Sequence, residues 1–559
     1  MKLKNIRALG YVKNALQASL LAGIVVWAAG AARAQGNPAP ATTPATTPAT
    51  SDDAGQNTVA GQSADAAQTA YTGQSSSQTP APAYGQENAP PPISENPPIS
   101  GLDLPGLEPH AAPLSYIQPG ATVSESLDSN VANSLGIGSV HSVSRALGSV
   151  VLQRLWSHYD LAADYIGGIG YYNVHSLGVT SLQQADIDQK ITWKRGQLSL
   201  RDSFSYLPEG NFGGAYGSLG SQGISSLGNS NFNVFINGGA FASLGTVPRL
   251  LNVSVADVSQ YLTPKSAITA EAGYAVTHFY GNDPSTGGAF LNSSQISAET
   301  GYSRLLTPQT QVALEYGYQG FDFSTFGTAF HSHIIEAMVG HTISGRMDFL
   351  IAAGPQITDI TNTQTACTIT LINQPLSQCL PDGGTLITQT SKDRRLGVAG
   401  QARLRYRFPK TSLDLTYQRF LTSGSGLFLG SQSDVARFDA SRPITRVWGA
   451  VVDLGFARNT RQQNLTPAQL SACVEPGQPN PGNLPVCPGI DAARFDYGFA
   501  GFAVHRAVGH DFHLFGSYQF NELTFDHSFC GGLAVCSRIA NRHVVTFGLD
   551  WTPRPIRLD

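Results

Sequence analysis

The chain has 559 residues, a formal net charge of −4, 13% charged residues and 59 glycines. This weakly acidic balance argues against a nucleic-acid-binding protein, which as a rule carries a strongly basic patch or domain. No run of about 18 apolar residues follows the N-terminal segment, so the sequence predicts no transmembrane helix in the processed chain.

Residues 1–34 have the pattern of an export signal. A basic start is followed by an apolar run over 16–32, and "ARA" at 32–34 fits an A-x-A cleavage site. No cysteine stands at this site, which argues against a lipoprotein. We therefore expect 1–34 to be a signal peptide; the alternative is an uncleaved anchor helix, for which the apolar run is short.

Residues 35–117 are of low complexity, with repeats such as "NPAPATTPATTPATS". Ala, Pro, Thr, Ser and Gln bury too little apolar surface to offset the entropy lost on ordering, so we expect a disordered periplasmic segment. Its simplest role is a tether. A second reading makes "PPPISENPPIS" a Pro-rich ligand for a periplasmic or cell-wall partner.

From residue 118 onward, apolar and polar residues alternate with the period of a β-strand. In "QVALEYGYQG", Val312, Leu314, Tyr316 and Tyr318 share one face, while the other face carries polar residues and glycine. A second face of this kind does not form a dry core, which argues against a soluble β-sandwich.

The alternation predicts eighteen strands, although sixteen also fits the pattern. Their predicted ranges are 118–127, 147–157, 160–172, 183–194, 197–207, 247–259, 267–280, 291–304, 310–322, 331–343, 347–359, 394–408, 411–422, 432–441, 446–458, 491–506, 510–524 and 540–551.

The connections between these strands alternate in length. Short ones such as "TPKS" (263–266) and "PKTS" (409–412) are followed by long ones such as 208–246, 360–393 and 459–490. Short turns at one end and long loops at the other are typical of an outer-membrane barrel, and aromatic residues near the strand ends suit its interfaces. We therefore expect an all-β fold in which 118–559 forms an antiparallel transmembrane β-barrel.

At this point the chain resembles bacterial outer-membrane β-barrels of the porin-like class. The last strand, "RHVVTFGLDW", resembles the C-terminal assembly signal of that class, although "TPRPIRLD" follows it. The resemblance implies a location in the bacterial outer membrane, contact with outer-membrane lipid and docking to the barrel-assembly machinery. It also implies passive transport of small polar or ionic solutes, without a cofactor. The alternative is a non-conducting surface-display barrel that uses its loops and its Pro-rich tail.

Charged residues recur on the faces opposite the apolar ones, where they would line the lumen. The predicted basic lining residues are Arg403, Arg405, Arg407 and Arg437, and the acidic ones are Glu271, Glu299, Glu315, Glu336 and Asp348. The opposite assignment would place each arginine against lipid at a cost of about 2–4 kcal/mol near the midplane. Such rows tune ion selectivity in pores. A purely structural reading instead pairs Arg405 with Asp414 or Asp348.

All three pairs of neighbouring cysteines fall in long connections, and six cysteines agree with an exported protein. Fifteen pairings are open to six cysteines, and we choose sequence neighbours. The chosen pairs are Cys367–Cys379, Cys473–Cys487 and Cys530–Cys536.

No nucleophile motif or cysteine spacing for zinc is present in the sequence, so we expect no catalytic residue and no metal site. His331, His333 and His341 share one strand face, for which interface residues are a simpler reading than a metal site. The Gly- and Ser-rich connection 209–245 is either an infolded constriction or a mobile surface loop.

Overall fold

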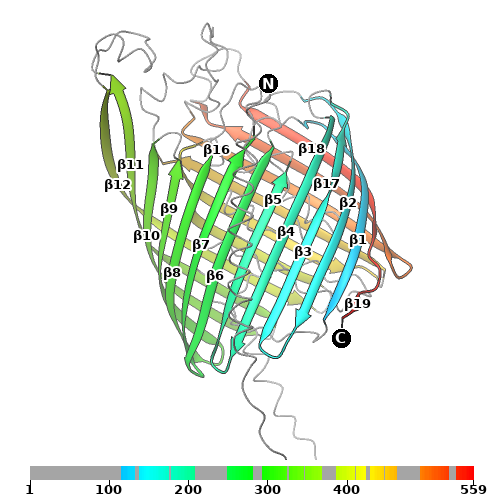
Figure 1. Ribbon diagram of the computed structural model, residues 1–559, viewed down its shortest axis with the longest axis horizontal. Coiled ribbons are helices and arrows are strands. Elements are labelled where there is room, and N and C mark those ends of the chain that lie inside the picture. Colours follow the sequence, from blue (N-terminus) through cyan, green and yellow to red (C-terminus); the bar gives the residue numbers. More distant parts are fainter. Residues whose placement is uncertain are drawn as a thin grey trace, which may run out of the picture. The chain divides into compact units, whose positions relative to one another are not determined.

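The computed structural model describes residues 115–131, 138–174, 178–207, 248–280, 292–323, 327–344, 346–367, 386–408, 411–422, 428–445, 447–462, 492–527 and 537–558. Nearly all of these residues lie in β-strands (Figure 1). The strands are β1 (Tyr116–Asp128), β2 (His141–Leu155), β3 (Tyr159–Tyr172), β4 (Gly178–Trp193), β5 (Gly196–Leu207), β6 (Arg249–Thr263), β7 (Ser266–Phe279), β8 (Ser293–Thr307), β9 (Thr310–Phe323), β10 (Thr328–Ser344), β11 (Met347–Cys367), β12 (Leu386–Phe408), β13 (Thr411–Thr422), β14 (Ser431–Pro443), β15 (Trp448–Arg461), β16 (Arg494–Val508), β17 (Phe512–Phe525), β18 (Ile539–Trp551) and β19 (Ile556–Arg557).

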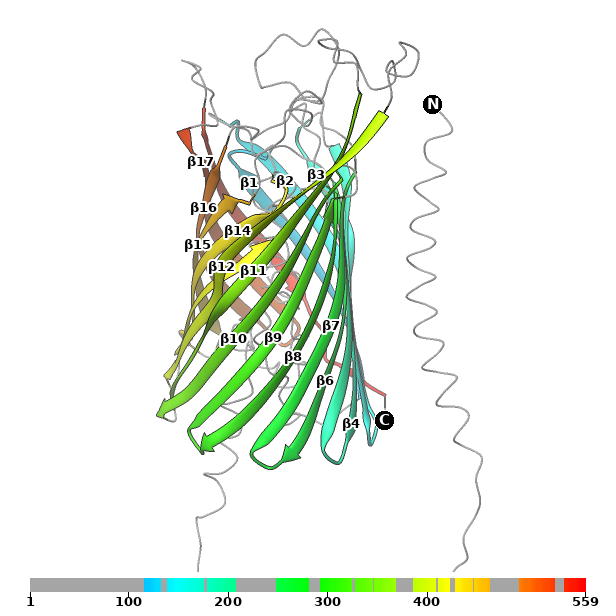
Figure 2. The ribbon, with the colours of Figure 1, turned by 90° about the vertical axis from the view of Figure 1, so that its left-hand side faces the viewer.

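The strands β1–β18 form one closed antiparallel barrel (Figures 1 and 2). Each pairs with its neighbour in sequence, and β1 also pairs with β18 through 121–128 against 544–551. Closure leaves no sheet edge in the wall, the condition that a strand structure must meet in lipid. The predicted barrel of about eighteen strands is therefore confirmed for the described residues.

The seam between β1 and β18 is held by polar side chains on the inner face. Thr122 donates a hydrogen bond of 2.6 Å to Asp550 Oδ1, and the hydroxyls of Ser126 and Thr546 are 3.0 Å apart. Nearer the loop end, Arg542 Nε lies 3.0 and 2.8 Å from the two carboxylate oxygens of Asp128, and Arg542 Nη2 also donates to Asp128. Both side chains of this ion pair are almost completely buried, at 1% and 0% exposure.

The residues after Trp551 fold back along the first strand. The two-residue strand β19 pairs with Tyr116 and Ile117, and Leu558 N donates to Ser115 O at 2.9 Å. Gln118 Nε2 also donates to Pro553 O at 2.9 Å. The tail that departs from the usual C-terminal pattern thus extends the seam past the end of β18.

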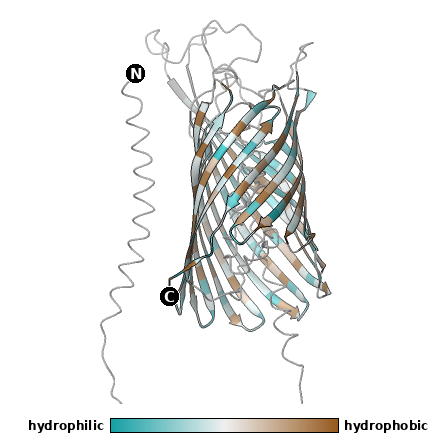
Figure 3. Cartoon of the chain, turned by 90° about the vertical axis from the view of Figure 1, so that its right-hand side faces the viewer, coloured by the Kyte–Doolittle hydropathy of each residue, from teal (hydrophilic) through white to brown (hydrophobic). Residues whose placement is uncertain are grey.

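Apolar and polar residues alternate along many strands of the barrel wall (Figure 3), and the burial of their side chains shows that the apolar ones face outward and the polar ones inward. Outward side chains such as Val123, Leu314 and Phe547 are 62%, 59% and 65% exposed. Their strand neighbours Thr122, Glu315 and Thr546 are buried on the inner side. This is the reverse of a soluble protein and suits an exterior in contact with hydrocarbon.

Aromatic residues form an outer girdle at the short-turn end of the strands. Exposed outward members are Trp156, Tyr159, Trp193, Phe408, Trp448, Phe512 and Trp551. Rings of this kind suit the boundary between hydrocarbon and water. Tyr172, an aromatic residue at the loop end of β3, is instead 2% exposed on the inner side, next to Val143.

Several strands are longer than the sequence predicted, and β11 and β12 differ most. The connection expected at 360–393 is wrong at both ends, because β11 runs to Cys367 and β12 starts at Leu386. Their pairing continues residue by residue from Thr361–Lys392 to Cys367–Leu386, and the hairpin extends past the neighbouring strand ends (Figure 2). Thr and Ile favour strands, but a hairpin polar on both faces lacks the alternation that marks a lipid-facing strand.

Several predicted features lie outside the described residues. These are the signal peptide 1–34, the low-complexity segment up to 114, the connection 209–245, all six cysteines except the backbone of Cys367, and the side chain of Arg407. Among the described residues, no helix has the length and hydropathy to cross a membrane.

Gly354 on β11 permits a close approach of two strands. A Cβ at this position would collide with the backbone carbonyl of Ile335 on β10. We expect Gly354→Ala to shift the backbone and to destabilise the barrel by about 1–3 kcal/mol, as overpacking does elsewhere. Gly498→Ala is the matched control, because a Cβ there meets nothing within 4 Å. Urea unfolding in lipid vesicles measures the difference, and equal midpoints for both variants would contradict the close approach.

Candidate functional site

The inner wall carries a row of glutamates on four consecutive strands, β7 to β10. This acidic row consists of Glu271, Glu299, Glu315 and Glu336. Glu271 lies directly opposite Glu299 in the strand register, and Glu315 lies directly opposite Glu336. Opposed Cβ atoms on neighbouring strands are about 5 Å apart, so the row concentrates negative charge on one arc of the wall.

The acidic row is packed into the wall. Glu315 and Glu336 are only 3% and 4% exposed. Glu315 leans across β8, because a Cβ on Gly301 would lie 2.6 Å from Glu315 Cγ and 3.1 Å from Thr269 Oγ1. Glycine at 301 therefore makes the room that the glutamate side chain occupies.

The row continues onto strands where the sequence analysis named no lining residue. Asp257 on β6 lies opposite Glu271, and Arg201 Nη2 on β5 donates to Asp257 Oδ2 at 2.8 Å. On β4, Asp188 accepts a hydrogen bond of 2.9 Å from Ser199. These inward positions follow from the alternation within the predicted strands 183–194, 197–207 and 247–259, which was the available signal.

The predicted arginines of β12 lie in a second, charge-balanced arc. Arg405 donates to Asp348 Oδ2 from Nε at 3.0 Å and from Nη2 at 2.9 Å. Arg403 Nε lies 3.9 Å from Asp414 Oδ2. Of the two partners that the structural reading offered for Arg405, the structure pairs it with Asp348 across the β11–β12 register.

A further buried ion pair lies two strands beyond. Arg437 donates to Asp453 through Nε at 3.0 Å and Nη2 at 2.9 Å, and these side chains are 8% and 1% exposed. Asp453 was missed because only the cation of this pair stood out in the sequence. Two buried charges lose much hydration, so each such pair stays favourable only while both partners are present.

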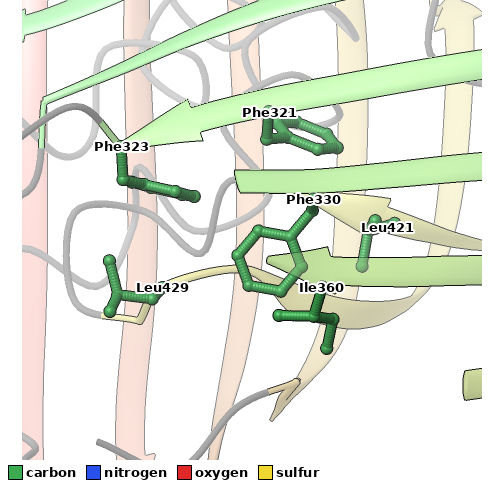
Figure 4. Close-up of a cluster of buried hydrophobic side chains, with 6 residues drawn as sticks. All are labelled: Phe321, Phe323, Phe330, Ile360, Leu421 and Leu429. Carbon is green, nitrogen blue, oxygen red and sulfur yellow. The ribbon is translucent and has the colours of Figure 1, made fainter. Parts of the chain in front are cut away.

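At the loop end of the barrel the inner wall becomes apolar (Figure 4). The members of this apolar cluster come from β9, β10, β11, β13 and the segment before β14, and none is more than 2% exposed: Phe321, Phe323, Phe330, Ile360, Leu421 and Leu429. The rings of Phe323 and Phe330 pack edge to face with centroids 5.9 Å apart.

Residues 428–430, just before β14, connect the apolar cluster to side chains of β16 and β17. Gly430 has a φ of +73°, and the rim of the Phe330 ring lies 2.9 Å from where its Cβ would be. Phe428 packs against Phe495 of β16, with centroids 5.1 Å apart, and Phe495 packs in turn against Phe525. Apolar side chains thus continue from β9 to β17. The signal for this in the sequence was "GLFLG", three apolar residues inside a glycine-rich connection.

The histidines of β10 lie on the outer face. Tyr316 and His333 are hydrogen-bonded through the hydroxyl and Nδ1 at 2.8 Å, and Tyr318 and His331 likewise at 2.8 Å. Among the described residues, no group of three or more His, Cys, Asp or Glu could hold a metal ion. The arrangement matches the interface reading of these histidines.

No family model and no curated protein matches the chain. Three solved structures are similar over most of its length. OprD of Pseudomonas aeruginosa is 8% identical over 79% of this chain and 96% of its own, with a TM-score of 0.34. OccAB3 of Acinetobacter baumannii is 9% identical over 78% and 99%, with a TM-score of 0.35. A BenF-like porin from Pseudomonas fluorescens Pf-5 is 8% identical over 80% and 100%, with a TM-score of 0.36.

The barrel's own features decide its class. Its eighteen strands are antiparallel and closed, its outer face is apolar with an aromatic girdle at the short-turn end, and its inner face is polar and charged over most of its height. These are the defining properties of transmembrane barrels, and a circumference of eighteen strands belongs to the porin size range. The chain is a porin-like outer-membrane β-barrel in its fold.

Proposed function

We propose that the chain is a channel through which small polar or ionic solutes diffuse passively across the outer membrane. The acidic row is the observation that carries this proposal. Like charges on adjacent strands destabilise a sheet that serves only as a scaffold. In a wet lumen, carboxylates such as Glu271 and Glu299, which are less buried than Glu315 and Glu336, attract counter-ions and select among solutes. The proposal assigns no catalytic residue, cofactor or metal.

The width of the barrel supports the same function. Barrels of 16–18 strands leave an aqueous channel when nothing fills them. The acidic row lies on β7 to β10. The arginines of β12 and β14, each paired with an aspartate, lie on another part of the inner wall. A dipolar solute would therefore meet a defined orientation of the field as it crosses.

A non-conducting display barrel is the second candidate, and the apolar cluster favours it. Side chains that are 0–2% exposed at the loop end seal the inner wall on that arc. In this candidate the loops contact partners outside the cell. The Pro-rich segment 35–117 would contact a periplasmic or cell-wall partner. In either case we propose that β18, with Val545, Phe547, Leu549 and Trp551 on one face, docks to the assembly machinery.

Reconstitution of the purified chain separates the two candidates. In planar bilayers we expect discrete conductance steps from the channel, and in liposome swelling we expect entry of small sugars or amino acids. A chain that shows the shifted gel mobility of a folded barrel and yet gives no conductance would support the display barrel.

A further inference from the structure

The outer face of the barrel carries a row of charged side chains at the loop end of four consecutive strands. This outer ion ladder consists of Arg419 on β13, Asp434 on β14, Arg458 on β15 and Asp496 on β16, with Arg494 beside it. Each of the four lies directly opposite the next in the strand register. The ladder thus forms one continuous row across four neighbouring strands.

Hydrogen bonds and ion pairs link the members of the outer ion ladder. Arg419 Nη1 donates to Asp434 Oδ1 at 3.1 Å, and Arg458 Nε donates to Asp496 Oδ1 at 3.0 Å. Arg494 Nε lies 3.6 Å from the other oxygen of the same Asp496. Three guanidinium groups therefore share two carboxylates, and the ladder keeps a net positive charge.

The solvent-accessible surface of the ladder is more cationic than its ratio of three arginines to two aspartates suggests. The arginine side chains are 43–46% exposed, whereas Asp434 and Asp496 are 23% and 22% exposed. The carboxylates are the more buried partners, so the guanidinium groups make up most of the charged surface that solvent can reach. An approaching molecule would meet donors that suit a phosphate group.

Lipid-facing residues lie directly below the ladder on the same strands. Leu415, Leu454, Phe456 and Phe502 point outward and are 42–48% exposed. A molecule that contacts both the apolar side chains and the arginines of the ladder would carry acyl chains at one end and an anionic group at the other. The free-energy cost of exposing an arginine to lipid becomes small only near the membrane interface. The ladder therefore also marks the depth at which the hydrocarbon ends and the lipid headgroups begin.

We propose that the outer ion ladder binds the phosphate group of anionic lipids in the membrane leaflet at the loop end. Arg419, Arg458 and Arg494 supply the donors. Asp434 and Asp496 fix their orientation and limit the net charge. The binding is a property of the outer face and does not depend on whether the lumen conducts.

Native mass spectrometry of the full chain in detergent tests the proposal with phosphatidic acid as the probe. We expect phosphatidic acid to bind more tightly than phosphatidylcholine. The variant R419Q/R458Q/R494Q should lose at least about tenfold in affinity for phosphatidic acid, because each basic residue at a membrane surface adds to the attraction for an anionic lipid. The variant D434N/D496N should gain affinity, because it removes two negative charges.

The matched control removes three outward arginines at the short-turn end of the strands: Arg154, Arg304 and Arg442, each replaced by Gln. These side chains are exposed on the same outer surface. Equal losses in the control and in the ladder variant would assign binding to net charge and overturn the proposal. Displacement of the lipid by an equal concentration of inorganic phosphate would also overturn it, since a lipid site gains from the acyl chains. Gel mobility of unheated samples shows that each variant is folded.

Discussion

Replacing Asp128 by Asn will destabilise the barrel by about 3–5 kcal/mol, the usual cost of removing one partner from a buried ion pair. The substitution leaves the guanidinium of Arg542 buried at the seam where β18 meets β1. It also weakens the hydrogen bond from Asn130 N to Asp128 Oδ1, which is 2.9 Å long. The midpoint of urea unfolding in lipid vesicles reports the loss.

Two further variants make this expectation specific to the ion pair. Replacing both partners by apolar residues, as in D128L/R542M, should cost much less than D128N, because no buried charge is left alone. Asp393→Asn is the matched single control, since Asp393 is 62% exposed in the β11–β12 hairpin. A loss for D128N no larger than that for D393N would show that the seam does not depend on this pair.

Replacing Phe330 by Ala will raise the conductance of the barrel. The Phe330 ring is fully buried in the apolar cluster and contacts the backbone of Gly430, so its loss removes the support of residues 428–430. Loss of a buried phenylalanine costs about 3–5 kcal/mol, enough to free a docked segment. Apolar constrictions also block ions by excluding water, and alanine would relieve this barrier.

Phe547→Ala is the control for that experiment. It makes the same chemical change on the outer face of β18, where Phe547 is 65% exposed. We expect its single-channel conductance to equal that of the parent chain. If Phe330→Ala also matched the parent while the parent conducts, the apolar cluster would not limit the flow.

The strands were predictable because the membrane imposes a simple rule on each of them. Leu314 and Tyr316 face lipid while Glu315 and Gly317 face inward, and a period of two follows wherever this contrast holds. This alternation is absent from the β11–β12 hairpin beyond Ile360, so the sequence did not predict that part of the two strands. There both of its faces are polar, so no alternation marks it.

The pairing of side chains was predictable only between sequence neighbours. Arg405 and Asp348 belong to adjacent predicted strands, so their contact was among the alternatives. Asp128 and Arg542 are 414 residues apart, and their contact exists only because the barrel closes. No local pattern identifies such a pair.

The apolar cluster was missed for a different reason. The inner face was expected to be polar, and Phe321, Phe323 and Phe330 continue the inward positions of β9 and β10 at their loop ends. Their burial depends on Leu429, which comes from another part of the chain. The sequence therefore indicated a polar inner wall but not its apolar loop end.

The reversal potential across a salt gradient tests the central claim most directly, namely that the acidic row faces a conducting lumen. The parent chain should prefer cations at 0.1 M salt, where the Debye length is about 10 Å, and less so at 1 M, where it is about 3 Å. Replacing Glu271, Glu299, Glu315 and Glu336 by Gln keeps the size of the side chains and should remove most of that preference. A parent chain without conductance, or a preference unchanged in the glutamine variant, would contradict the claim.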